Sequence, residues 1–217
     1  ANTVPGTVSG WDAAYQYAHA NMSNPGLPWK ALFDSAILYS KDGFPVTASL
    51  ARWQEVNVDP TDSEFRNLQR FSGFRQTYLK PDGSPYKVGE VMKLPQLAQT
   101  YQLIAEKGAD EFYRGSIAKK MVADLQKNGG VLTLNDFANH RADWVKPLTV
   151  DYRGYTAYNL PPNTQGMASL EILNILNNID VKKLGEGTPD YYHVMVEATK
   201  EAFVDRDKYL SDPEFVK

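Results

Sequence analysis

Four consecutive residues have the types and spacing to bind an anionic or carbonyl group. Asn163, Thr164, Gln165 and Gly166 follow two prolines at the end of a strand-like run and precede an apolar, helix-like run over 168–176. A loop that leads from a strand into a helix leaves backbone N–H groups and a helix N-terminus pointing outward. The same residues also suit a stiff turn in which Asn163 or Thr164 caps the helix. The sequence therefore predicts a candidate substrate-binding loop and leaves plain capping open.

Other chemically capable residues are more scattered. His193 and Glu197 lie four apart on one predicted helix face, but a metal site needs a third ligand that the sequence does not mark, and a helix-surface pair is the simpler interpretation. Arg206, flanked by two Asp residues, can lock its helix to neighbouring loops by bidentate hydrogen bonds. Thr3 and Ser9 have no base beside them in the sequence, and no Gly-x-Ser-x-Gly, phosphate-binding or dinucleotide motif occurs. We predict no metal, no cofactor and no self-sufficient catalytic constellation.

The composition limits the classes of partner that this chain can bind. Its 217 residues are 42% hydrophobic and 23% charged, typical of a globular protein, and contain no apolar run long enough to cross a bilayer. A formal charge of -3 and a pI near 5.7 argue against a nucleic-acid surface. The absence of cysteine removes thiolate chemistry, disulfides and cysteine-based zinc sites. We therefore expect small-molecule or protein partners.

The elements that must position these residues are mostly helical. Apolar periodicity predicts helices over 7–21, from Pro28 to Gly43, over 47–55, from 94 to Gly108 and from 117 to 128, and Asp59 to Asp62 is expected to open another. A turn-rich stretch over 70–95 contains at most an edge strand at 88–93. Residues 144–152 and 155–160, separated by Arg153-Gly154, predict a β-hairpin, and two long helices follow. With no repeat or linker, the economical interpretation is one α+β, mostly helical unit over 1–217.

Five blocks together resemble the large subunit of γ-glutamyltransferases (γ-glutamyltranspeptidases). They are VPGTVSG (4–10), DGFPV (42–46), LIAEKGADEFYRG (103–115), NGGVLT (128–133) and DRDKYLSDP (205–213). The order and spacing of these blocks resemble those of the family's large subunit along essentially the whole chain. The resemblance identifies the chain as a middle-to-late part of the large subunit, expected to be truncated at both ends.

The resemblance implies a fragment of the αββα fold of N-terminal-nucleophile (Ntn) hydrolases. In such proteins a precursor cuts itself, and the new N-terminal Thr of the small subunit attacks a γ-glutamyl amide, with its own amine as base. The acyl group then passes to water or an amine. The family's nucleophile and its carboxylate-binding Arg both lie outside this chain, and Arg114, Arg153 and Arg206 do not stand at the matching place. The implied partners are the small subunit and a γ-glutamyl or acyl amide, and the isolated fragment is expected to be inactive.

One departure from the family bears on the substrate. Where γ-glutamyltransferases usually read Pro-Pro-Pro-Ser-Ser-Gly-Gly, this chain has LPPNTQGM over 160–167, more similar to the cephalosporin-acylase-like branch. The open alternatives are thus a cephalosporin or glutaryl acylase-like amidohydrolase and a non-catalytic carboxylate-binding module. The resemblance suggests a periplasmic or extracellular location, with a cytoplasmic one as the alternative.

Overall fold

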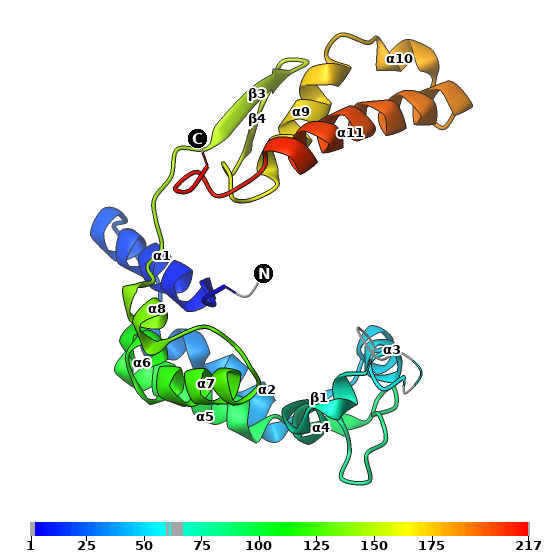
Figure 1. The fold of residues 1–217 in the computed structure, drawn as a ribbon. Helices are drawn as coiled ribbons and strands as arrows, with labels where there is room; N and C mark the ends of the chain where they lie inside the picture. Colours follow the sequence, from blue (N-terminus) through cyan, green and yellow to red (C-terminus); the bar gives the residue numbers. More distant parts are fainter. Residues whose placement is uncertain (1–2, 60, 62–66, 217) are drawn as a thin grey trace. The chain divides into compact units, whose positions relative to one another are not determined.

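The computed structural model describes residues 3–59, 61 and 67–216, and the chain divides into two compact units, Ala1–Ala142 and Asp143–Lys217 (Figure 1). Each unit has buried hydrophobic clusters of its own. The organisation as a single unit stays a prediction.

The first unit is built from helices with one minimal sheet. Its elements are α1 (Thr7–Asn21), η1 (Trp29–Phe33), α2 (Asp34–Asp42), β1 (Phe44–Pro45), α3 (Ala48–Val56), η2 (Leu68–Arg70), α4 (Ser72–Tyr78), β2 (Val91–Met92), α5 (Pro95–Lys107), α6 (Ala109–Tyr113), α7 (Ser116–Lys127) and α8 (Leu134–Asn139). The two short strands β1 and β2 pair antiparallel. The main core lies among α5, α7 and α8, where Ile104, Ala118 and Phe137 are almost completely buried.

Local signals account for most of these helix ends. The predicted helix over 7–21 is confirmed, although Gly6 rather than a side-chain cap precedes it. Gly43 and Gly108, with φ of 101° and 77°, end α2 and α5 as predicted, because glycine enters the left-handed region without a Cβ clash. Thr133 and Asp136 form a reciprocal capping box at the start of α8.

Two differences from the predicted elements have physical reasons. Helix α4 falls in the stretch predicted to be turn-rich. The sequence did not predict it because its seven residues include Gly73 and β-branched or aromatic types of low helix propensity. In this helix, the rings of Phe74 and Tyr78 pack with their centres 5.2 Å apart. The segment from Pro28 begins as a 3₁₀ turn, η1, before it becomes α2. The helix expected to open at Asp59 to Asp62 lies largely outside the described residues.

The second unit is a hairpin covered by helices. Strands β3 (Leu148–Tyr152) and β4 (Tyr155–Asn159) pair antiparallel, and α9 (Gly166–Leu176), α10 (Val181–Leu184) and α11 (Pro189–Tyr209) follow. The predicted hairpin is confirmed with a shorter first strand. Its two turn residues, Arg153 and Gly154, have φ of 52° and 89°, the positive pair that the tightest hairpin turns require.

Helix α9 is the central element of this unit. It packs against both strands and against α11, and its apolar residues extend around much of its circumference, as expected of a helix covered on more than one side (Figure 1). Arg153 donates to the Ile179 carbonyl at 2.8 Å, just beyond the end of α9, so the hairpin turn is tied to the helix.

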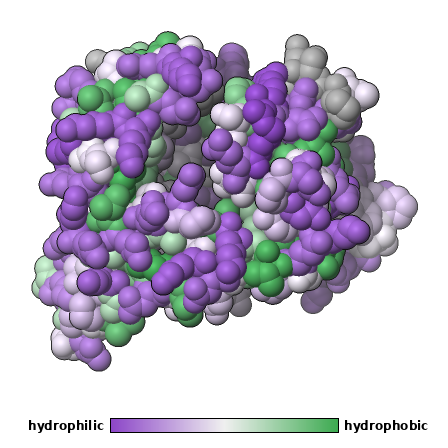
Figure 2. All heavy atoms as spheres, turned by 90° about the horizontal axis from the view of Figure 1, so that it is seen from below, coloured by the Kyte–Doolittle hydropathy of each residue, from purple (hydrophilic) through white to green (hydrophobic). Residues whose placement is uncertain are grey.

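The chain as described is mostly helical with two small two-stranded sheets, one of them the β3–β4 hairpin, which confirms the coarser part of the expected fold class. Among the described residues, no helix combines the length and apolarity needed to span a bilayer. On the face drawn in Figure 2, hydrophilic side chains predominate and hydrophobic ones lie between them in small groups.

Candidate functional site

The predicted loop connects β4 to α9 and is closed by its own hydrogen bonds. The Thr164 hydroxyl donates to the carbonyls of Leu160 and Pro161, at 3.2 and 3.0 Å. It accepts only a long bond, 3.4 Å, from the Gly166 amide. Asn163, Thr164 and Gln165 are exposed, whereas Gly166 is buried. The helix begins at Gly166, and the side chain of its N-cap residue, Gln165, makes no capping hydrogen bond, so neither Asn163 nor Thr164 is the N-cap.

Gly166 is tightly enclosed. A Cβ atom at this position would lie 2.3 Å from the Leu160 carbonyl oxygen and 2.6 Å from Oδ1 of Asn159. Both oxygens are held: the Leu160 carbonyl accepts from Thr164 Oγ at 3.2 Å, while Asn159 Oδ1 accepts from the Leu160 amide at 2.8 Å and Asn159 Nδ2 donates to Ser169 Oγ at 2.7 Å. This position therefore requires glycine for the close approach of the loop to the first turn of α9.

Arg206 joins the loop to the C-terminal end of α11. Its Nη1 donates to Gln165 Oε1 at 3.2 Å, and its guanidinium carbon lies 3.8 Å from the centre of the Phe203 ring. Nε and Nη2 both contact Oδ1 of Asp207, at 2.8 and 2.7 Å. The prediction that this Arg connects its helix to a neighbouring loop is confirmed, with Asp207 rather than Asp205 as the acid that binds it. The arrangement places a cation next to the exposed loop.

Asp205 instead faces Glu171 of α9. Burial raises the pKa of the Glu171 carboxyl, and a hydrogen bond and the negative charge of Asp205 raise it further. Among the described residues, Oε2 of Glu171 is buried and has no hydrogen-bond donor. The Glu171 carboxyl therefore keeps its proton to a higher pH than an ordinary glutamate does.

Of the two residues considered as a metal-binding pair, His193 and Glu197, the carboxylate of Glu197 binds a lysine side chain. Glu197 accepts from Lys200 Nζ at 2.9 and 3.1 Å, and this hydrogen bond is the main reason that the pKa of Glu197 is lowered. Within the described part of the chain, no group of three or more metal-ligating His, Asp or Glu side chains occurs. Glu197 therefore forms a charge pair on the helix surface with Lys200.

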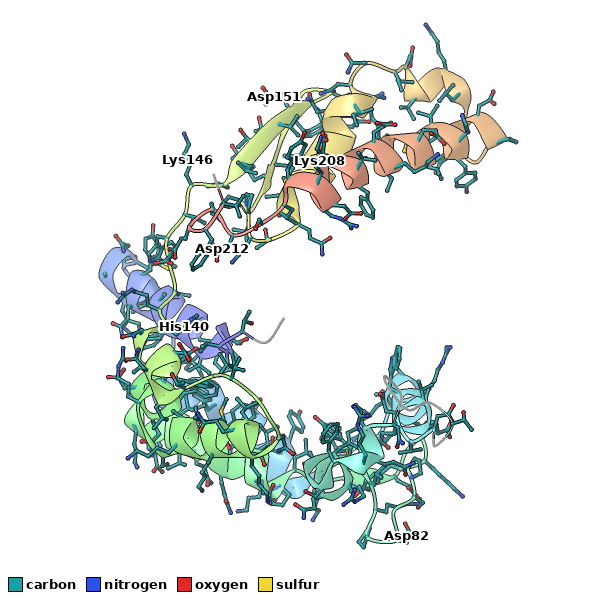
Figure 3. The ribbon with its side chains drawn as sticks, in the orientation of Figure 1. Asp82, His140, Lys146, Asp151, Lys208 and Asp212 are labelled. Carbon is teal, nitrogen blue, oxygen red and sulfur yellow. The ribbon has the colours of Figure 1, made fainter. Side chains whose placement is uncertain are left out.

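One contact between chemically capable side chains had no signal in the sequence. Ser9 Oγ lies 3.1 Å from Nε2 of His140, shown beside α1 in Figure 3, although the two residues are 131 positions apart. The Ser9 hydroxyl also lies 2.8 Å from the Gly6 carbonyl, to which it can donate, and the direction of its hydrogen bond with His140 depends on the tautomer of the imidazole. The Tyr113 ring stacks on His140, and the Tyr113 hydroxyl donates to Pro5 at 2.7 Å. This cluster anchors the start of α1.

The other two arginines considered from the sequence have structural contacts. Arg114 pairs with Asp110 and donates to the Ala138 carbonyl at 2.8 Å, and Arg153 binds the carbonyl of Ile179. Neither lies at the loop. Of the predicted site residues, the structure brings Gln165 together with Arg206, while Asn163 and Thr164 stay at the exposed end of the loop.

Comparison with known proteins decides the family. The gamma-glutamyltranspeptidase family matches residues 1–217, the whole chain. The chain belongs to this family. A relative from Bacillus subtilis, the glutathione hydrolase-like YwrD proenzyme, is 38% identical over 98% of the chain. This assignment confirms the resemblance on which the sequence analysis relied.

Solved structures agree with the assignment. The crystal structure of Helicobacter pylori gamma-glutamyltranspeptidase matches 99% of this chain and 58% of its own, with a TM-score of 0.83 and 28% identity. The cephalosporin acylase from Bacillus halodurans matches 94% of this chain and 37% of its own, with a TM-score of 0.79 and 36% identity. The chain spans 38% of the length of the Bacillus subtilis relative, so it corresponds to part of such a protein.

Proposed function

We propose that this chain is the large-subunit scaffold of a γ-glutamyltransferase or hydrolase whose complete protein cleaves γ-glutamyl amides such as glutathione. The observation that carries the proposal is the family match along the entire chain, together with the relative named as a glutathione hydrolase-like proenzyme. The complete protein adopts the αββα architecture, and its nucleophile is an N-terminal Thr outside this chain. The acyl group passes from that Thr to water or to an amine.

The described residues are consistent with a supporting role. An N-terminal Thr uses its own amine as the base, so the large subunit need not supply a histidine-based triad. The 160–165 loop, tied to α11 through Gln165 and Arg206, is the part of this chain that we assign to the neighbourhood of the small subunit and the acyl pocket. The isolated chain is inactive on this proposal, because the nucleophile is absent from it.

A second candidate is an acylase-like amidohydrolase. Two observations favour it: Asn163, Thr164 and Gln165 replace the usual family sequence, and the cephalosporin acylase of Bacillus halodurans shares 36% identity with the chain. The two candidates share the nucleophile and the processing step, and differ in the acyl group that the pocket accepts.

The test is to express the complete reading frame that contains this segment and to measure its intact mass. Two pieces, the smaller beginning with Thr, are expected; a single uncut product would overturn the proposal. Turnover of a γ-glutamyl amide and of a glutaryl amide by the processed protein then separates the two candidates.

The loop assignment needs its own variants. We expect Thr164→Ala and Gln165→Ala to change the ratio of kcat/KM for the two amides or the extent of processing. Thr100→Ala in α5 is the matched control, since its hydroxyl bonds a carbonyl one helical turn away, at 3.0 Å, as an ordinary helix hydroxyl does. Unchanged turnover and processing in both loop variants would mean that the loop only connects β4 to α9 and has no part in substrate choice or processing.

A further inference from the structure

The guanidinium of Arg206 is held by two neighbours on its own helix. Its Nε and Nη2 both contact Oδ1 of Asp207, at 2.8 and 2.7 Å, and its central carbon lies 3.8 Å from the centre of the Phe203 ring. The side chain is only 23% exposed. Lys208, labelled in Figure 3, lies instead over the Tyr209 ring, at 4.8 Å. Arg206 is therefore a fixed cation beside the 160–165 loop.

This cation fixes the orientation of the Gln165 amide. A guanidinium can only donate hydrogen bonds, so the Gln165 atom that lies 3.2 Å from Arg206 Nη1 must be the carbonyl oxygen, Oε1. The two N–H groups of Gln165 Nε2 are then turned away from Arg206. Gln165 is exposed, and within the described part of the chain neither N–H group has an acceptor. The side of this amide that solvent meets is thus the donating side.

The rest of the loop defines which ligand these donors suit. Residues 160–165 include no acid, and the Thr164 hydroxyl donates to carbonyls within the loop itself. A hydrogen-bond acceptor therefore meets free donors beside a cation. Asp207 offsets much of the charge of Arg206, so the arrangement suits a single carboxylate better than a phosphate group with two charges.

We propose that Gln165 is a specificity-determining residue that donates a hydrogen bond to a carboxylate of the amide substrate, and that Arg206 is the positioning residue that holds its amide in the donating orientation. This inference rests on the proposed function, which assigns the loop to the neighbourhood of the acyl pocket. A γ-glutamyl amide of an amino acid carries one carboxylate on its acyl half and another on its amine half. Both present the same chemistry to Gln165, and the choice of substrates separates them.

The test is Gln165→Glu in the complete precursor. The substitution replaces the donating NH₂ group by an oxygen, while the other oxygen still accepts from Arg206 and keeps the loop tied to α11. The substrates are γ-glutamylglycine and γ-glutamylethylamide, which differ in the carboxylate of the amine half. We expect the KM of γ-glutamylglycine to rise about tenfold to a hundredfold with kcat and processing unchanged, because a bond to a charged acceptor is lost.

The pattern of the change identifies the carboxylate. A rise in KM confined to γ-glutamylglycine assigns the donor to the amine half, and an equal rise for both substrates assigns it to the acyl half. An unchanged KM for both, or a loss confined to kcat, would overturn the proposal. Gln99→Glu, at an exposed position of α5, is the matched control and is expected to leave both KM values at those of the wild type.

Arg206→Lys tests the positioning role. Lysine keeps the charge but loses the planar fork and its stacking, so the Gln165 amide is free to turn. We expect a smaller rise in the same KM, and no further rise when Arg206→Lys is added to Gln165→Glu, since the donor is already gone. Independent effects that multiply in the double variant would reject Arg206 as the positioning residue.

Failure of this inference differs from failure of the proposed function. A processed wild-type protein that cleaves γ-glutamyl amides, with Gln165→Glu unchanged in KM, would reject only the assignment of Gln165. An uncut wild-type product, or a processed one that cleaves neither substrate, would reject the proposed function itself.

Discussion

Replacing Gly166 with alanine is expected to destabilise the second unit. The added Cβ would lie 2.3 Å from the Leu160 carbonyl oxygen, well inside the 3.0 Å that real Cβ atoms keep from other atoms. Neither neighbouring oxygen can move freely, because the Leu160 carbonyl accepts from Thr164 and the Asn159 side chain is bonded to both the Leu160 amide and Ser169. The loop must therefore shift away from α9. Overpacking of this kind costs about 1–3 kcal/mol, opposed by roughly 0.5–1 kcal/mol from the better helix propensity of alanine.

The assay is urea unfolding of Gly166→Ala followed by circular dichroism. Gly10→Ala is the matched control, since Gly10 lies within α1 and a Cβ there would meet nothing within 4 Å. We expect a lower midpoint for Gly166→Ala and a midpoint equal to or above that of the wild type for Gly10→Ala. A Gly166 variant as stable as the Gly10 variant would refute the close approach between loop and helix.

Four further substitutions test the packing around the functional elements. Since the pKa of Glu171 is raised in the folded protein, its contribution to the free energy of unfolding falls as pH rises above about 4.5, so Glu171→Gln should flatten the pH dependence there. Asp205→Asn should flatten it only in part, because the burial of Glu171 remains. Tyr113→Phe, which loses the hydrogen bond to Pro5 at 2.7 Å, should cost about 1–3 kcal/mol in urea unfolding. Glu111 accepts from the first residue of α7, which lowers its pKa; Glu111→Gln should therefore reduce stability at pH 7 but much less at pH 3.

For each of these predictions, one result would contradict the reasoning. A pH profile of Glu171→Gln parallel to that of the wild type would mean that this carboxyl is not perturbed by burial and by Asp205. An unchanged urea midpoint for Tyr113→Phe would show that its hydroxyl does not hold the start of α1. A pH-independent loss in Glu111→Gln would point to packing and not to the charge of Glu111.

Local sequence patterns predicted many of the helix ends and the β3–β4 hairpin. The end of α2 at Gly43 and that of α5 at Gly108 depend on residues within one helical turn, so the local sequence alone predicts them. The hairpin followed likewise from Arg153-Gly154 between two β-rich runs. Helix α4 was missed because its weak local propensity leaves its stability to surrounding contacts.

By itself, then, the sequence determined most of the helices and the β3–β4 hairpin, placed the exposed loop from Asn163 to Gln165, and carried the motifs that identify the family. Only the tertiary structure decided which distant side chains meet. Arg206 reaches Gln165 across 41 positions, and Ser9 reaches His140 across 131. Periodicity marks every apolar position on α11 alike. Packing alone distinguishes the face that is buried on α9, with Ala198 and Ala202, from the exposed face that contains Val196 and Val204, because burial depends on what lies opposite a side chain and not on its neighbours in the chain.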